Sequence, residues 1–255
     1  MRFGSASATD LTGWRALASH MPHRASDDTR ISCVIPCLNE ASVIVACLEQ
    51  FKHLPGKWEV IVADSDSTDG TREIAAAYDG VTIVDAPRGR GVGMNAGATR
   101  ATSELLLFLH ADTILPDDAW QLIITALADK RTSATAFRLR LDRKEPMYKL
   151  VEVASHIRIL LQRTFFGDQA IAVRRRDFQS LGGFREVPLM EDVDLSRRLR
   201  RIGRLTVLSA QVTTSARRFE RHGVIRTLLL MTGRQVAYGL GVPAERLARW
   251  YAAVR

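Results

Sequence analysis

The stretch "ISCVIPCLNEASVIVACLEQFKHL", residues 31–54, joins a short apolar run to a helical pattern through a polar turn. The run over residues 31–38 is almost entirely apolar, as expected of a strand that is buried on both faces. After the turn, apolar side chains recur at helical spacing at Val43, Ile44, Cys47, Leu48 and Phe51. This stretch therefore predicts a buried strand, a turn and an amphipathic helix.

The same unit recurs along the first half of the chain. Further strands are predicted at "WEVIVADS" (58–65), "VTIVDA" (81–86) and "ELLLFLHAD" (104–112). Helices are predicted between them at "TDGTREIAAAY" (68–78) and at the glycine-rich "GVGMNAGATRA" (91–101). This alternation predicts an α/β fold, with a mostly parallel, Rossmann-like sheet and helices on both of its faces.

Polar residues cluster where three of these strands end. Asn39 and Glu40 follow the first strand, residues 64–69 follow the second, and His110 and Asp112 close the apolar run "LLLFLHAD". A histidine and a carboxylate are costly to bury without partners. Ligands of open parallel sheets bind at the carboxyl ends of the strands, so the three clusters predict one binding crevice.

The net charge of +8 is divided unevenly along the chain. Residues 1–130 hold 11 Lys and Arg against 17 Asp and Glu, whereas residues 131–255 hold 25 against 11. The acidic half suits a metal ion, and the arginine-rich half suits phosphates or an anionic membrane surface. The alternative is that the arginines only solvate helices. No nucleic-acid recognition motif accompanies the basic half, so a nucleic-acid partner is not expected.

Composition indicates an ordinary globular protein, with 46% apolar and 25% charged residues. An apolar run of spanning length and a secretory leader are both missing from the sequence, so we expect a cytoplasmic protein, at the inner face of the membrane if it contacts lipid. Cys33, Cys37 and Cys47 have no partners at zinc spacing and are expected to be reduced core thiols.

The glycine-rich segment "RGRGVGMNAG", residues 88–97, allows backbone N–H groups to approach a ligand closely. Arg88 or Arg90 can offer charge to a diphosphate. The segment lacks the Gly-Lys-Ser/Thr of a P-loop, and the first strand is not followed by GxGxxG. ATP hydrolysis and nicotinamide binding are therefore not the expected functions.

As an ordered set, these motifs resemble the family 2 glycosyltransferases of the GT-A fold, from about Ile31 to Arg204. The family's DDGSTDGT stands here as "DSDSTDGT". The resemblance implies that the nucleoside of a nucleotide-sugar is held by Pro36, Asn39 and Glu40, and that Asp64 hydrogen-bonds the base. It also implies that the donor is bound by Arg90, Gly91, Asn95 and His110.

"HAD" falls where the family carries its DxD metal motif. The resemblance implies that Asp112 binds Mn²⁺ or Mg²⁺, with donor oxygens and waters completing the shell. His110 replaces the first Asp, which leaves a weaker or altered metal dependence open. Many relatives add a histidine after the following strand, but Thr214 or Ser215 occupies that place here, and His222 is expected in a solvated loop. Arg217 and Arg218 are candidates to clamp the diphosphate or an anionic acceptor.

Two segments of the second half resemble the family's catalytic parts. "FFGDQAIAVRRRDF" (165–178) resembles the loop beside the donor sugar, which places Gly167, Asp168 and Gln169 at the donor sugar or the acceptor. "GGFREVPLMEDVDLSRRLRRIG" (182–203) matches the acidic motif, with Asp192 as the expected base and Glu191 beside it. The alternative is a helix with acids in its first turn and bases in its last. Asp194 is expected to cap that helix or to pair with Arg197 or Arg198.

The resemblance thus implies an inverting transfer of one sugar from a nucleotide-diphosphate sugar, expected to be a UDP-sugar, to a hydroxyl acceptor, lipid-linked acceptors included. A single transfer is expected because the processive QxxRW motif is missing. The GDQ and PLMEDVDL segments together resemble a small bacterial, non-processive branch. The alternative is a catalytically silent nucleotide-sugar-binding module.

One GT-A domain is expected, with a polar N-terminal extension (1–30), a nucleotide-sugar-binding half (31–130) and an acceptor-binding half with C-terminal helices (131–255). Two segments, 147–166 and 222–241, mix apolar residues with Arg and His, as helices at a membrane surface do. The favoured alternative is that these are core helices or homodimer-contact helices.

Overall fold

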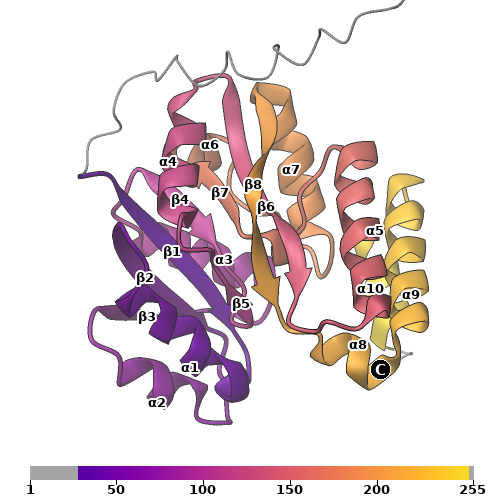
Figure 1. The fold of residues 1–255 in the computed structure, drawn as a ribbon, viewed down its shortest axis with the longest axis horizontal. Helices are drawn as coiled ribbons and strands as arrows, with labels where there is room; N and C mark the ends of the chain where they lie inside the picture. Colours follow the sequence, from indigo (N-terminus) through magenta and orange to yellow (C-terminus); the bar gives the residue numbers. More distant parts are fainter. Residues whose placement is uncertain (1–27, 253–255) are drawn as a thin grey trace, which may run out of the picture.

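A computed structural model describes residues 28–252, which form an eight-stranded sheet with helices on both faces (Figure 1). All but the end of the predicted polar extension lies outside the described residues. The strands are β1 (Arg30–Cys37), β2 (Lys57–Asp64), β3 (Val81–Asp85), β4 (Leu105–Phe108), β5 (Thr113–Ile114), β6 (Thr132–Leu141), β7 (Ile171–Arg174) and β8 (Arg204–Thr214).

Helices follow most of these strands. They are α1 (Ala41–Glu49), α2 (Thr71–Ala76), α3 (Arg90–Arg100), α4 (Ala119–Ala128), α5 (Pro146–Gln162), α6 (Arg175–Ser180), α7 (Glu191–Ile202), α8 (Arg217–His222), α9 (Val224–Gly239) and α10 (Ala244–Ala252). Two short 3-10 turns are η1 (Gln50–Lys52) and η2 (Gly167–Gln169).

The first half of the sheet is parallel, as its sequence predicts. β1 pairs in parallel with both β2 and β4, and β2 pairs with β3. In this register Cys37 lies opposite Asp64, the last residue of β2. The turns that carry Asn39 and Asp64 therefore leave the sheet at the same edge.

The second half of the sheet is mixed, which the sequence pattern alone did not specify. β7 runs antiparallel to both β4 and β6, while β6 and β8 are parallel. The two-residue β5 pairs antiparallel with the end of β8, with Thr113 opposite Thr214. This short pairing brings the "HAD" turn against the end of β8, and the Ser215 N–H donates to the Asp112 carbonyl at 3.2 Å.

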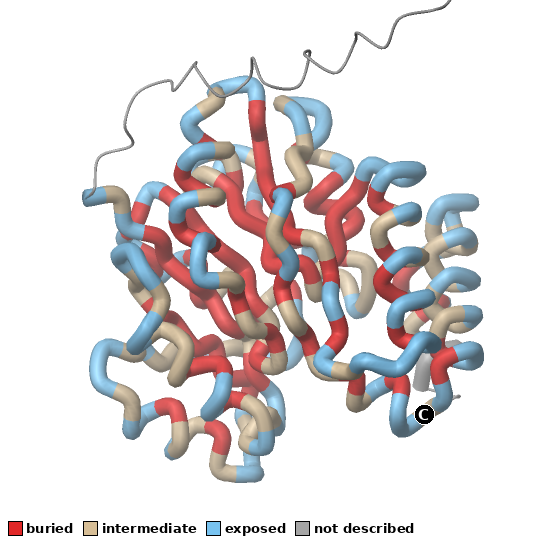
Figure 2. The backbone as a smooth tube through the Cα atoms, viewed as in Figure 1, coloured by how far each residue is buried: buried red, intermediate tan, exposed pale blue. Residues whose placement is uncertain are grey.

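The core lies in two layers, one on each face of the sheet (Figure 2). In β1, Ile31, Cys33 and Ile35 pack with α1 and α4, whereas Val34 packs with α3 on the other face. This alternation follows from the two-residue side-chain period of a strand. All three cysteines are buried and free, which confirms that they are core thiols.

The C-terminal helices form a third, smaller cluster beside the sheet, where α5, α8 and α9 pack together. Leucines on the outer sides of α5 and α9 are exposed: Leu150 is 61% accessible, Leu161 79% and Leu229 69%. Among the described residues, no helix has both the length and the apolar character needed to span a bilayer.

Replacing a helical glycine by alanine should have opposite effects on stability at Gly97 in the closely packed α3 and at Gly233 in the open α9. A Cβ at Gly97 would lie 2.4 Å from Val34 Cγ1, whereas a Cβ at Gly233 in α9 would meet no atom within 4 Å. Gly97→Ala should lower the free energy of unfolding by about 1–3 kcal/mol through overpacking. Gly233→Ala should raise it by up to about 1 kcal/mol through helix propensity. Urea unfolding measures both, and equal effects would contradict the packing of α3.

Candidate functional site

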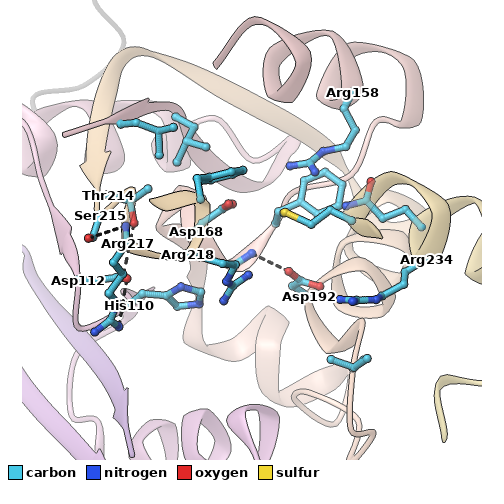
Figure 3. A pocket seen from close by; sticks show the side chains of 18 of the residues that line it. His110, Asp112, Arg158, Asp168, Asp192, Thr214, Ser215, Arg217, Arg218 and Arg234 are labelled. Atoms are coloured by element: carbon cyan, nitrogen blue, oxygen red, sulfur yellow. Dashed lines mark hydrogen bonds and ion pairs between the residues drawn. The ribbon is translucent and has the colours of Figure 1, made fainter. Parts of the chain in front are cut away.

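A pocket opens where the "HAD" turn, η2 and the start of α7 meet α5, α8 and α9 (Figure 3). Its charged and titratable lining side chains are His110, Asp112, Asp168, Asp192, Arg158, Arg217, Arg218 and Arg234. Carboxylates and guanidinium groups thus line one cavity. The residues that form it are far apart in the sequence. This arrangement suits a polar ligand that carries negative charge.

Asp112 lies between the end of β8 and the first residue of α8. Its Oδ1 accepts a hydrogen bond from Thr214 Oγ1 at 3.3 Å, and its Oδ2 lies 3.3 Å from Arg217 Nη2. The same Arg217 nitrogen lies 2.5 Å from Glu40 Oε2. Burial lowers the pKa of Arg217, but the hydrogen bond and the attraction to Glu40 and Asp112 raise it more, so its net shift is upward.

His110 is held as a neutral imidazole at the pocket wall. Burial lowers its pKa well below the usual value, and the charges of Arg90, Arg218 and Arg217 lower it further. Its Nε2 has no hydrogen-bond partner among the described residues. A neutral, unpartnered imidazole nitrogen at a pocket is available to a ligand hydroxyl.

Asp192 is oriented by two backbone N–H groups. Its Oδ2 accepts from Gly167 at 2.7 Å and its Oδ1 accepts from Val193 at 2.7 Å. The Gly167 contact depends on the missing side chain, because a Cβ there would lie 2.7 Å from His110 Nε2. Gly167 therefore hydrogen-bonds the carboxylate of Asp192 and packs closely against the imidazole of His110.

Glu191 points away from this pocket toward α3. Its Oε1 lies 3.5 Å from Arg90 Nη1, and the residue is only 4% exposed. Burial raises the pKa of Glu191 and the neighbouring Asp192 raises it further, while Arg90 acts in the opposite direction. The pair predicted from the acidic motif is therefore split, with Asp192 in the pocket and Glu191 behind it.

Asp168 and Arg158 line the same pocket as Asp112. The Arg158 guanidinium stacks 3.7 Å from the centre of the Phe166 ring, and its Nε has no partner among the described residues. Asp168 Oδ1 is also unpartnered there. Burial raises the pKa of Asp168, against the attraction of Arg158. The Arg158 Nε–H group and the Asp168 Oδ1 atom can therefore each form a hydrogen bond with a ligand.

The predicted nucleoside-binding residues form a second, adjoining cluster. The carboxylate of Asp64 accepts hydrogen bonds from Ser67, and the Asn39 N–H donates to Ser67 Oγ at 3.0 Å. The Glu40 N–H donates to Thr71 Oγ1 at 2.8 Å. These bonds lock the turns after β1 and β2 to each other, and the Glu40–Arg217 pair connects this cluster to the pocket.

Four other predicted residues lie behind or beside the pocket. Asn95 uses its amide on the Phe184 backbone, donating to the carbonyl at 2.8 Å and accepting from the N–H at 2.9 Å. Gly91 lies beside Glu191, where a Cβ would come 3.3 Å from the Glu191 Cβ. Gln169 is buried and accepts from the Phe166 N–H at 2.9 Å. Pro36 lies within β1, opposite Ala63 of β2.

Strained backbone marks the same segments. Asn39, Asp66, Ala170 and Met190 all have positive φ, and Met190 (φ 68°) immediately precedes Glu191 and Asp192. Left-handed conformations of non-glycine residues cost on the order of 1–3 kcal/mol and persist where packing imposes them. Such strain is typical of positions where the backbone must aim a side chain.

The described residues do not fit the divalent ion that the resemblance implies. They contain no group of three or more His, Cys, Asp or Glu side chains arranged to hold a metal. Asp112 already faces a guanidinium, and the second oxygen of that carboxylate is bonded to Thr214. Hard cations prefer several oxygen ligands, whereas the described residues offer at this place one carboxylate that is already paired with Arg217.

Comparisons with known proteins identify the family and the fold of this chain. The family model described as "Glycosyl transferase family 2" matches residues 32–180, more than half of the chain. The chain belongs to glycosyltransferase family 2. Residues within it are 35% identical over 99 positions to the glycosyltransferase AglE of Haloferax volcanii, covering 35% of this chain and 32% of that protein. A 40% identity over 94 residues relates it to the succinoglycan biosynthesis protein ExoA of Rhizobium meliloti, covering 33% and 28%.

The matches therefore span about a third of the length of these curated relatives.

Among solved structures, S. aureus TarS 1-349 in complex with UDP matches with a TM-score of 0.61 at 18% identity, covering 87% of this chain and 78% of that chain. Mannosyltransferase PcManGT from Pyrobaculum calidifontis, in complex with GDP-Man and Mn²⁺, matches with a TM-score of 0.57 at 21% identity, covering 89% and 81%. Both likenesses confirm the predicted GT-A type of fold.

Sequence analysis did not single out three of the residues that line the pocket. Arg158, Arg234 and Gln235 lie on α5 and α9, whose segments were interpreted as membrane-surface or core helices. The sequence did contain an indication, because the charged group of an arginine in a mostly apolar helix must reach water or a polar site. The sequence could not show that this destination was the site.

The buried Glu191 predicts a pH-dependent cost in stability. Its pKa is raised, so the folded protein retains this proton at pH values where the unfolded chain has lost it. Stability therefore falls as the pH rises above the ordinary glutamate range of about 4.3. Glu191→Gln should raise the melting temperature at pH 8 relative to wild type, with a gain that shrinks toward pH 4. The exposed Glu186 on the preceding loop supplies the control Glu186→Gln, which should show no such trend.

Proposed function

We propose that this protein transfers a single sugar, with inversion, from a nucleotide-diphosphate sugar to a hydroxyl group, with Asp192 as the general base. The observation that carries the proposal is the placement of Asp192: two backbone N–H groups fix the carboxylate, and it lines a pocket beside the predicted donor cluster. Glu191 and Arg90 lie behind it, so only one of the two adjacent carboxylates faces the cavity.

The proposed donor is a nucleoside-diphosphate sugar. TarS was solved with UDP-GlcNAc and PcManGT with GDP-Man, so structures of this fold hold such donors with either base. A UDP-sugar remains our expectation for this chain. We assign residues 31–130 to donor binding and residues 131–255 mainly to the acceptor, consistent with Asp64 and Asn39 in the first half and Asp192 in the second.

The reaction forms a bond between the acceptor oxygen and the anomeric carbon as the bond from that carbon to the diphosphate oxygen breaks. The departing electron pair stays on the diphosphate, and the acceptor proton goes to the Asp192 carboxylate. General-base catalysis of this kind contributes roughly 10²- to 10⁴-fold. Asp168 and Arg158 then offer unpartnered atoms to the sugar or acceptor hydroxyls.

Two observations bear on the proposed Mn²⁺ or Mg²⁺. PcManGT contains Mn²⁺, which favours a metal for this chain as well. The arginine that faces Asp112 favours the opposite. The proposed base does not depend on this choice, because Asp192 lies on α7 and makes no contact with Asp112.

A second candidate function is a silent nucleotide-sugar-binding module. The replacement of the first DxD aspartate by His110 favours it, because such a change is compatible with binding without turnover. The fixed orientation of Asp192 favours catalysis instead.

Asp192→Asn should separate the two functions. The change nearly preserves shape but removes basicity, so donor binding should stay close to wild type while turnover falls by about 10²- to 10⁴-fold. A thermal-shift screen of UDP-, GDP- and dTDP-sugars first identifies the donor. Turnover is then measured as release of the nucleoside diphosphate. Turnover near wild type in this variant would show that the base lies elsewhere.

Asp194→Asn is the matched control on the same turn of α7. Asp194 is buried and pairs with Arg198 at 2.8 Å and with Arg185 at 3.4 Å, so it holds the helix in place. This variant should unfold more readily and retain turnover below its melting temperature. Loss of turnover in a folded Asp194→Asn protein would move the base to that carboxylate.

We further propose that the acceptor is lipid-linked and that α5 and α9 contact an anionic bilayer. The same two helices that supply Arg158 and Arg234 to the pocket expose leucines on their outer sides. Charge is consistent with this occupant: α9 contains no Asp or Glu, and Glu152 of α5 is buried and paired with Lys149. Apolar side chains flanked only by basic charge are typical of helices that lie on a membrane.

Flotation with vesicles that contain or lack phosphatidylglycerol tests this contact. Wild type should float only with the anionic vesicles, and Leu150→Gln combined with Leu161→Gln should weaken binding at least tenfold, since each buried leucine contributes on the order of 1.5–3 kcal/mol. Val45→Gln on α1 is the control, because Val45 is also exposed but lies far from these helices (Figure 1). No flotation, together with a dimeric mass in solution that the double variant abolishes, would assign the surface to a second copy instead.

A further inference from the structure

Arg217 lies against two carboxylates, Asp112 and Glu40, and supplies positive charge to both. One of its guanidinium nitrogens lies 3.3 Å from Asp112 Oδ2 and 2.5 Å from Glu40 Oε2. The side chain remains 39% exposed, so part of the guanidinium is open to a ligand in the pocket. Arg218 and the neutral His110 line the same pocket.

Three features of the residues around Asp112 are unfavourable for binding a cation. His110 stands where the family's first Asp is expected, so this position supplies no carboxylate, and Arg217 and Arg218 line the same pocket. Thr214, at the end of β8, donates its hydroxyl to Asp112 instead of offering a nitrogen ligand. Asp112 itself is paired with a guanidinium. Positive charge at this site is therefore already supplied by the protein.

The chemistry of the expected ligand matches this charge. A diphosphate leaving group needs positive charge and hydrogen-bond donors at its oxygens as the electron pair arrives. Guanidinium groups meet this need through planar, paired N–H donors, which fit phosphate better than a single ammonium does. Arg217 and Arg218 are adjacent at the start of α8, so one helix delivers both groups to the pocket.

We propose that Arg217 and Arg218 bind the diphosphate of the donor and stabilise it as the leaving group, in place of a divalent metal ion. This inference rests on the proposed function as a nucleotide-sugar transferase. When the anomeric bond breaks, the electron pair moves onto the diphosphate oxygen and the two guanidinium groups bear its charge. No proton moves at this end of the reaction, because both arginines stay charged. Glu40 and Asp112 position Arg217 rather than ligate a metal.

Titration calorimetry with UDP and with GDP, in EDTA and in Mn²⁺, tests the proposal without requiring an acceptor. Wild type should bind one of these nucleotides in EDTA, with a Kd that Mn²⁺ changes by less than about threefold. Arg217→Gln should weaken that binding by about 10- to 100-fold, because it removes a charge-assisted hydrogen bond of roughly 1.5–3 kcal/mol. Arg218→Gln should act in the same direction.

Arg221→Gln is the matched control, because Arg221 is an exposed arginine on the same helix that does not line the pocket. It removes the same charge and should leave the Kd unchanged. If Arg217→Gln does not fold, the wild-type comparison between EDTA and Mn²⁺ still decides the question.

The two proposals fail in different ways. Binding to wild type that requires Mn²⁺, or that tightens tenfold or more with it, would overturn the role of the arginines while leaving the transferase proposal intact. Equal losses in Arg217→Gln and Arg221→Gln would also overturn it, since only general charge would then matter. Absence of UDP and GDP binding under both conditions would overturn the proposed function itself.

Discussion

A carboxylate that is buried or half-buried needs a partner, and this constraint organises the whole site. Asp64 is held by Ser67, Asp112 by Arg217, Asp192 by the Gly167 N–H and Glu191 by Arg90. The Arg217 contact joins α8 to the edge of the sheet, and the Gly167 and Arg90 contacts join η2 and α3 to the start of α7. The parallel register of β1 and β2 provides the edge, and the acidic residues determine what must be brought to it.

The identity of each partner decides what its carboxylate can do. Backbone N–H groups, rather than a paired guanidinium, fix the orientation of Asp192, as the proposed role of this carboxylate as general base requires. A guanidinium holds Asp112, so that carboxylate serves to aim Arg217 at the pocket. Glu191 is buried against α3, and its raised pKa shows that the fold bears a cost to keep it there. Three carboxylates that look equivalent in sequence are therefore separated by their surroundings.

The sequence predicted the first half of the fold well because its strands and helices alternate with clear periodicity. Buried strands in parallel order must end at one edge, so Asn39, Asp64 and His110 could be placed near one another without coordinates. The mixed second half escaped prediction because the apolar pattern of a strand such as β7 does not specify its direction, and because the two-residue β5 has no periodicity of its own. Its pairing with β8 depends on tertiary contacts, and that pairing brings Thr214 and Arg217 to Asp112.

Individual site residues were predicted less evenly than the motifs that contain them. Asn95 lies within a predicted donor motif, yet both ends of its amide bind the Phe184 backbone, a partner 89 positions away that no local pattern indicates. Arg158 was not predicted as a site residue at all, because the apolar character of α5 led to another interpretation of its segment. Short-range patterns thus locate functional segments, whereas the direction of each side chain is set by distant packing.

Gly167 shows how closely the two ends of the proposed reaction are joined. A side chain there would come 2.7 Å from His110 Nε2 and 3.5 Å from Asp192 Oδ2, so both groups occupy the space that a Cβ would need. The Gly167 N–H also fixes the Asp192 carboxylate. A shift of η2 would consequently move the proposed base and the His110 imidazole together. The proposed acceptor and donor sides of the pocket are therefore coupled through the glycine of the GDQ segment.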